Sequence, residues 1–388
     1  METQLTGTGE TPYERQMRIL QQPDGMATYF SSEEQRQLFR HFVNETAPDL
    51  LVIPTTHSNN PWLVHLSPLA LVKPSGQDLT HDALRAALLS LASLDIGMKM
   101  DKAIKDQQNN AMYGLSEAQR STAMKLLDMG RCVEAVSNDL ESADLTVATA
   151  VILAIRDRLA GSPLWEAPLA HGVGTIISYK GAAGFLGKNV NAGRRFLVEQ
   201  MACAELLGAM TNLTAPKLLQ WENDDWLMYP GEDGMKDNLE LVYGWNRAIL
   251  QFCARALILG DEGGQLDRLK RGNAEAGYPA VNDNINAREI SLSLRSGQLL
   301  DEIIHVRSSA TPLVLPTRAV HGINSILLCV EIALMADFLG YDAALYDERI
   351  QSKVRAVLNT VDEAFSQGMY SGVQLSYASD LDGGVCGF

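Results

Sequence analysis

The stretch LTHDALRAALLSLASLDIG, residues 79–97, decides the fold class of this chain. Within it Leu84, Leu88, Leu91 and Leu94 recur three or four positions apart, which is the spacing of one face of an α-helix. The stretch lacks the alternation of apolar and polar residues and the β-branched runs that are typical of a strand. We therefore expect a helix that buries its leucine face.

The same spacing recurs along most of the chain. Further helices are expected over residues 33–45, 116–139, 144–161, 193–213, 236–259, 286–306, 319–340 and 345–368. Asp144 is expected to cap the start of one of them, and Gly161 is expected to end it. Their apolar residues are mainly Leu, Ala and Met, and period-2 patterning is almost absent. The sequence therefore predicts an all-α fold with roughly a dozen helices.

The expected helices form a single large domain. Residues 1–32 are polar and are expected to form an N-terminal arm, while residues 33–388 form the helical domain. The segments 214–235, 260–284 and 307–318 are too short and too varied in composition to be flexible linkers. We expect them to be loops packed within the domain.

The charge and the cysteines exclude several classes of function. The net charge of −15 repels phosphate and anionic lipid, so direct nucleic-acid binding and membrane docking are not expected. The five cysteines are isolated from one another and form no metal-ligand or disulfide pattern. They are Cys132, Cys203, Cys253, Cys329 and Cys386. We therefore expect reduced thiols packed in the core, no metal and no cofactor.

Nothing in the sequence indicates secretion or a membrane span. Residues 1–25 lack the apolar core of a signal peptide. The most apolar stretch, 326–339, contains Glu331 and Asp337 and is too short to cross a bilayer. A cytoplasmic or nuclear location is expected.

Several segments resemble one family. They are NPWLVHLSPLAL (60–71), HDALRAALLSLAS (81–93), DLTVATAVILAIRDRLAGSPLW (144–165) and LVYGWNRAILQFCARALIL (241–259). Together they resemble the fungal-specific transcription factor domain, the regulatory domain of fungal zinc-cluster transcription factors, in its sterol-uptake-regulator type. The segment PLAHGVGTII (168–177) departs from the family pattern by one apparent insertion that displaces His171.

The resemblance implies a helical domain with an internal apolar pocket that, in sterol-sensing members, holds a lipid. It does not by itself imply catalysis. The family's zinc-cluster module needs six closely spaced cysteines, and none precedes Cys132 here. We therefore expect a stand-alone protein without that DNA-binding module.

Two groups of residues are candidates for the site. His305 and Arg307 end one expected helix, and Arg318 and His321 begin the next, so the loop between them can bring these side chains together. His305, Arg307 and His321 are catalytic candidates, although a basic helix end also has a purely structural role. The ligand-binding candidates are His57, Trp62, His65, Trp221, Trp226, Tyr243, Trp245 and Arg318. These aromatic residues either line a pocket or anchor helix packing.

Three functions are compatible with these patterns. The first is a cofactor-free cyclase or pericyclase, of Diels–Alderase type, in fungal secondary metabolism, because such reactions need a shaped apolar cavity and a few donors. The second is a ligand-sensing regulatory domain that acts in transcriptional control. The third is a carrier. In each case the expected ligand is a hydrophobic small molecule of terpenoid or polyketide type, and the macromolecular partner is either a second copy or a regulatory protein.

Overall fold

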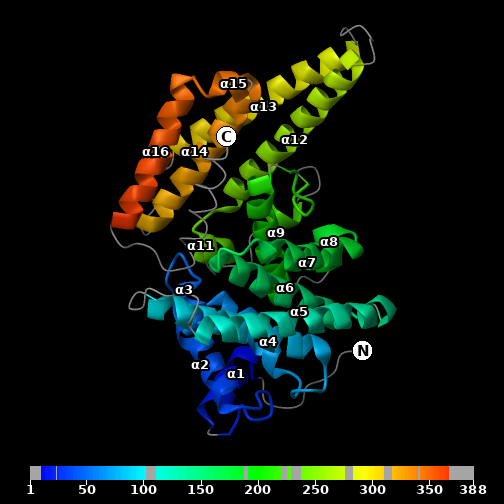
Figure 1. The fold of residues 1–388 in the computed structure, drawn as a ribbon, viewed down its shortest axis with the longest axis vertical. Helices are drawn as coiled ribbons and strands as arrows, with labels where there is room; N and C mark the ends of the chain where they lie inside the picture. Colours follow the sequence, from blue (N-terminus) through cyan, green and yellow to red (C-terminus); the bar gives the residue numbers. More distant parts are fainter. Residues whose placement is uncertain are drawn as a thin grey trace. The chain divides into compact units, whose positions relative to one another are not determined.

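The computed structural model describes residues 10–22, 24–101, 111–137, 139–187, 191–212, 214–220, 225–228, 237–275, 283–309, 317–339 and 341–366. Over these ranges the chain is helical and contains no strand, which confirms the all-α prediction (Figure 1). The chain divides into two compact units. The first comprises residues 1–180 and 184–201, and the second comprises residues 181–183 and 202–388.

The first unit is built around two long, buried helices, α4 (Leu79–Asp101) and α6 (Leu140–Leu159). Its helices are α1 (Pro12–Gln21), α2 (Glu33–His41), α3 (Ala47–Asp49), α4 (Leu79–Asp101), α5 (Ala111–Ser137), α6 (Leu140–Leu159) and α7 (Glu166–Ser178). Helices α8 (Gly181–Leu186) and α9 (Ala192–Asn212) are divided between the units, and residues 184–186 and 192–201 belong to the first. Helix α4 packs against both α5 and α6, and α6 packs against α7. In Figure 1 the cyan and green helices α4, α5 and α6 lie together.

Helix α4 confirms the helix expected from the opening stretch. Leu84, Leu88, Leu91 and Leu94 are fully buried. The helix is also buried on its other sides, however, because polar residues such as Arg85 are enclosed as well. The Arg85 guanidinium donates to the carbonyl oxygens of Ala70 (2.7 Å) and Lys73 (2.9 Å) and forms an ion pair with Asp82, so both its donors and its charge have partners inside the unit.

A buried ion-pair network joins α5 to α6. Asp157 is fully buried and accepts two hydrogen bonds from Arg120, at 2.6 and 2.8 Å, and one from Arg156 at 2.9 Å. Arg156 also donates to the Ser116 hydroxyl (3.1 Å), which in turn donates to the carbonyl of Ser90 (2.8 Å). This network fixes the register of three helices, because a buried charge must stay paired.

The N-terminal arm contains more structure than its polar composition indicates. Helix α1 begins with a capping box, in which Thr11 and Glu14 each bond the other's backbone N–H. Ile19, Met26 and Phe30 are buried within the first unit. The sequence pattern underestimates this segment because its apolar residues are few and widely spaced.

The ends of helix α6 test the sequence expectations directly. Gly161 follows the helix with a φ of +62°, which confirms it as the stop. The N-cap is Asp139 rather than Asp144, so the helix begins earlier than expected. Asp144 instead lies inside the helix and binds Arg194 through two hydrogen bonds of 2.7 Å.

The second unit consists mainly of long helices, with short helices before them and between the last two. Its helices are α10 (Asp225–Met228), α11 (Asn238–Tyr243), α12 (Arg247–Glu275), α13 (Asp283–Ser309), α14 (Thr317–Leu339), α15 (Tyr341–Ala344) and α16 (Glu348–Ser366). Helices α12, α13 and α14 pack against one another, and α14 packs against α16. Glu331 of α14 is fully buried and pairs with Arg307 (3.1 Å) and with Lys353 of α16.

Two helix boundaries in this unit differ from the sequence expectation. The helix expected over 236–259 is divided at Gly244, whose φ of +72° ends α11. Helix α12 then continues through the segment 260–275, where a glycine-rich loop was expected. Each helical glycine costs about 1 kcal/mol relative to alanine. Packing and ion pairs against α13 offset this cost.

The cysteines and the apolar helices agree with the sequence expectations where the structure describes them. Cys203 and Cys253 are buried and Cys329 is half-buried, and none of the three is in a disulfide. Burial raises the pKa of Cys253 and of Cys329 to about 12, so both remain unreactive thiols. Across the described ranges, no helix has both the length and the hydropathy that crossing a membrane requires.

Candidate functional site

The first unit brings two of the predicted ligand-binding residues together. Pro61 begins a π-helix, Trp62–Leu66, and the Asn60 side chain accepts a hydrogen bond from the Trp62 backbone N–H at 3.0 Å. π-Helical segments are rare and occur frequently at functional sites. The turn places the Trp62 ring in the core, where it is fully buried, and leaves His65 half-buried.

Phe196 of α9 completes this aromatic cluster. Its ring centroid lies 5.0 Å from that of Trp62 in an edge-to-face arrangement, with an interplanar angle of 80°. The His65 ring lies 5.7 Å from the same phenylalanine. His57, by contrast, is exposed on the short 3₁₀ helix His57–Asn59. The cluster therefore consists of Trp62, His65 and Phe196, with His57 outside it.

Two fully buried polar groups of this region have no hydrogen-bond partner among the described residues. They are the indole Nε1–H of Trp62 and the whole side-chain amide of Gln200. Gln200 follows Phe196 by one helical turn and so lies on the same face of α9. A buried donor or acceptor without a partner costs about 1–3 kcal/mol. These groups therefore favour an additional polar partner at this position.

The charged groups around the cluster are already paired. Arg194 binds Asp144, and Arg195 binds the buried Glu199 at 2.9 Å. Burial lowers the pKa of His65, so its imidazole is neutral at neutral pH and can donate one hydrogen bond and accept another. The groups of the cluster that remain are the neutral donors and acceptors of Trp62, His65 and Gln200.

The predicted catalytic residues lie in the second unit. His305 is exposed on α13 and His321 is half-buried on α14. Arg307 binds the buried carboxylate of Glu331, which gives it a structural role. Arg318 lies in the first turn of α14, and its side chain is outside the described residues. A catalytic role for these residues stays a prediction.

The predicted aromatic residues of the second unit lie near the start of α12. Tyr243 and Trp245 stack with ring centroids 5.4 Å apart, and both are nearly buried. Trp226 of α10 is also nearly buried, and Trp221 is outside the described residues. Arg247 donates to the carbonyl of Leu227 at 2.9 Å, which ties α10 to α12. These contacts pack the helices together, and a ligand-binding role for these residues stays a prediction.

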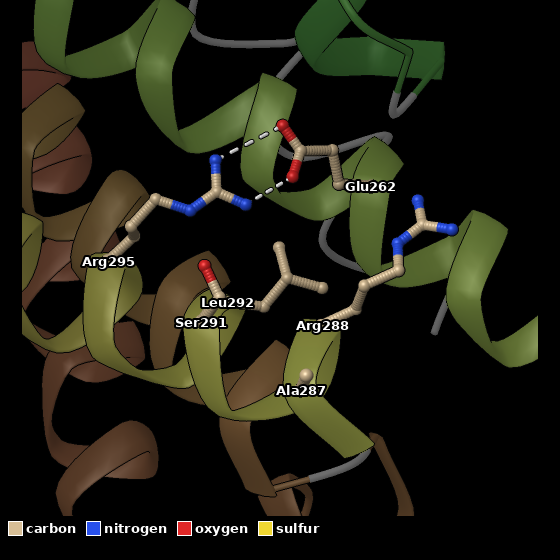
Figure 2. A pocket seen from close by; sticks show the side chains of 6 residues that line it. All are labelled: Glu262, Ala287, Arg288, Ser291, Leu292 and Arg295. Carbon is tan, nitrogen blue, oxygen red and sulfur yellow. Dashed lines mark hydrogen bonds and ion pairs between the residues drawn. The ribbon is translucent and has the colours of Figure 1, made fainter. Parts of the chain in front are cut away.

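Sequence patterns did not identify Phe196 or Gln200. The only local signal was the polar pair Glu199 and Gln200 between apolar residues of α9. A surface hollow on the second unit was missed as well. It has a volume of about 210 Å³ and is lined by Glu262, Ala287, Arg288, Ser291, Leu292 and Arg295 (Figure 2). Because this hollow is open to solvent and bordered by charged residues, it does not correspond to the internal apolar pocket, which stays a prediction.

No group of His, Cys, Asp and Glu side chains within the described ranges has the arrangement of a metal site.

Comparison with known proteins gives one match. A family model described as fungal specific transcription factor domain matches residues 37–378, which is most of the chain. No curated protein and no solved structure matches.

Proposed function

Because the chain belongs to the fungal specific transcription factor domain family, we propose that it is a ligand-sensing regulatory domain that acts in transcriptional control. The observation that carries this proposal is that Trp62 and Gln200, which is one turn after Phe196 on α9, are buried polar side chains without a hydrogen-bond partner in the described part of the chain. A sensor needs a site that is incomplete without its ligand, since a ligand shifts an equilibrium only by its differential affinity.

The ligand that suits this site is a hydrophobic molecule with isolated oxygen functions, of the terpenoid or polyketide type. The Trp62 indole would donate to a carbonyl or hydroxyl oxygen, and the Gln200 amide would both donate and accept. Phe196 and the ring of Trp62 would contact its carbon skeleton. Neutral His65 provides one further hydrogen bond without introducing a charge.

Ligand binding would act by stabilising the first unit. The π-helix that carries Trp62 and the first half of α9 would gain hydrogen bonds that they lack without ligand. A ligand at about one hundred times its Kd stabilises the folded state by about 2.7 kcal/mol. A stabilisation of this size is enough to shift the population of conformations that are available to a transcriptional partner.

The test is direct binding to the purified full chain. Terpenoid and polyketide probes that carry a ketone or hydroxyl group are titrated while the unfolding midpoint is measured. Trp62→Phe keeps an aromatic ring and removes the N–H, and Gln200→Leu removes the amide. Both variants should lose about tenfold or more in affinity, the effect of one buried hydrogen bond. The matched control, Trp245→Phe in the second unit, should bind as the wild type does.

Equal affinity of Trp62→Phe, Gln200→Leu and wild type would contradict the proposed site. Failure of every probe to shift the unfolding midpoint would contradict ligand sensing itself.

A cofactor-free cyclase, of Diels–Alderase type, is the second candidate. Uncharged, buried donors that polarise a carbonyl in an apolar surrounding are the groups that such a catalyst uses. The same binding experiment distinguishes the two functions when the probe is recovered and analysed. A probe returned unchanged supports the sensor, whereas conversion without added cofactor, abolished by Trp62→Phe, supports the cyclase.

A further inference from the structure

Helices α12 and α13 form an antiparallel hairpin with a regular series of cross-helix ion pairs. Arg255 binds Glu302 through hydrogen bonds of 2.5 and 3.1 Å. Seven residues further along α12, Glu262 binds Arg295 through two hydrogen bonds, one of 3.3 Å (Figure 2). On α13 the partners Glu302 and Arg295 are also seven residues apart. The ladder therefore follows the heptad spacing of a coiled coil.

The strict heptad position after Glu262 and Arg295 lacks an ion pair, because the third cross-helix ion pair is displaced by one residue to Lys270 and Glu289. Seven residues after Glu262 stands Leu269, and seven residues before Arg295 stands Arg288. Leu269 is 48% exposed and offers no carboxylate. The neighbouring acid, Glu289, is bound by Lys270 at 2.8 Å. Arg288 therefore has no ion-pair partner among the described residues.

Arg288 borders the hollow shown in Figure 2. Its side chain extends toward α12 beside Glu262, whose carboxylate is already bound by Arg295. With two arginines and one glutamate, the hollow carries a net positive charge on a chain whose net charge is −15. The Ser291 hydroxyl lines the same hollow. The hollow therefore complements a carboxylate.

Apolar side chains are exposed on the adjacent face of α13. Ile290 is 69% exposed and Leu294 is 61% exposed, and the two are one helical turn apart. Leu294 also follows Ser291 by three residues, so it lies beside the hollow on the helix surface. Apolar residues beside an arginine that has no ion-pair partner among the described residues give this face the composition of an interface, where Arg is enriched.

We propose that Arg288, Ser291 and Leu294, with Leu269 and Ile290 at the border, form a docking surface for an acidic amphipathic helix of a partner protein. A carboxylate of that helix takes the vacant position of the ladder and binds Arg288. Its apolar residues cover Leu294 and Ile290 in the helix-in-groove mode of recognition. This inference is independent of the ligand proposed for Trp62, because it concerns a macromolecular partner of the second unit.

The test uses a labelled probe and the full chain. The probe is an amphipathic peptide of about five helical turns with a leucine stripe flanked by glutamates. A second peptide carries glutamine in place of each glutamate. Fluorescence anisotropy should show that the glutamate peptide binds about tenfold more tightly, since bonds to charged groups exceed neutral ones. The preference should decrease at high salt.

Four variants assign the binding to this surface. Arg288→Glu reverses the charge and should weaken the glutamate peptide about tenfold or more. Leu269→Glu supplies the missing carboxylate within the chain, so it should weaken the peptide similarly without lowering the unfolding midpoint. Leu269→Gln is its uncharged control. Arg268→Glu makes the same charge change as Arg288→Glu, but at the residue before Leu269 on α12. It should leave the affinity for the glutamate peptide unchanged.

Three results would overturn the proposal. One is equal binding of the glutamate and glutamine peptides. Another is equal weakening by Arg268→Glu and Arg288→Glu, because that result indicates a general charge effect. The last is self-association of the chain, measured by sedimentation, that Arg288→Glu abolishes, because the surface then belongs to a second copy. Circular dichroism of each variant confirms that the helices have formed.

Discussion

Buried charged residues are held by specific hydrogen bonds, and Asp95 shows how such a group responds to pH. Its carboxylate accepts hydrogen bonds from His41 (2.8 Å), Thr46 (2.9 Å) and Lys99 (3.0 Å). Burial alone would raise the pKa of Asp95. The hydrogen bonds, chiefly those from His41 and Lys99, outweigh burial and keep the pKa below its ordinary value.

The direction of this shift predicts how stability depends on pH. Because the pKa is lower in the folded state, Asp95 stabilises the fold above the unfolded-state pKa of about 3.9. That contribution is lost as pH falls through the folded-state pKa. The difference in unfolding free energy between wild type and Asp95→Asn should be present above about pH 5 and shrink below about pH 4. Urea denaturation at a series of pH values measures it.

Thr46→Val is the companion variant, because it keeps the carboxylate and removes one donor. The folded-state pKa of Asp95 then rises toward its unfolded-state value, so the contribution of Asp95 to stability should be smaller than in wild type and should be fully lost at a higher pH. A wild-type advantage over Asp95→Asn that stays constant or grows in acid would contradict the assignment.

At the scale of elements, backbone conformation at a single glycine separates two helices. Gly244 ends α11 with its N–H bonded to the carbonyl of Glu240, and α12 begins at Arg247. The φ of +72° at Gly244 is in the left-handed region, which residues with a Cβ rarely adopt. This turn brings Tyr243 and Trp245 into their stacked arrangement.

Replacing this glycine tests the role of the turn. Gly244→Ala should destabilise the chain by about 1–2 kcal/mol, because alanine is strained in the left-handed conformation. Gly263→Ala is the matched control within α12, where an added Cβ meets no neighbouring atom. It should stabilise slightly, by about 0.5–1 kcal/mol, since alanine favours the helix. Thermal unfolding of both variants measures these effects, and similar midpoints would contradict the interpretation.

Local patterns predicted the helices better than their ends and contacts. The leucine spacing of α4 and the stop at Gly161 are properties of neighbouring residues, so the sequence was sufficient for both. The N-cap at Asp139 and the continuation of α12 beyond residue 260 depend on packing, which a local pattern does not contain. The same holds for the candidate site: residues within one local turn were predicted, and residues brought in by packing were not.

Trp62 and His65 were identified from the turn that carries them. Their partner Phe196 comes from a helix far along the chain, and only the folded structure brings it within 5.0 Å of Trp62. Gln200 was missed for a related reason. Its importance comes from the absence of a hydrogen-bond partner among the described residues, and that is a property of its surroundings rather than of its type.

At the scale of the whole molecule, net charge sets what the chain can bind. A net charge of −15 opposes association with DNA, whose affinity for proteins comes largely from contacts to phosphate. We expect no binding of the chain to double-stranded DNA in an anisotropy titration, even at low salt. Binding that weakens steeply as salt increases would contradict this expectation, because it would reveal a basic surface.

The seven-residue repeat of the α12–α13 hairpin has a consequence for how the chain can vary in evolution. Among the described residues beyond the Glu262–Arg295 ion pair, few side chains are buried, so they contribute little to the core of their unit. Removal of seven residues from each helix would keep the direction of every remaining side chain around its helix and the order of the remaining ion pairs. The hairpin can therefore lengthen or shorten when both helices gain or lose seven residues together. An insertion in only one helix, or one that is not a multiple of seven residues, would misalign the ion pairs. We therefore expect that deletion of seven residues from each helix leaves the unfolding midpoint unchanged.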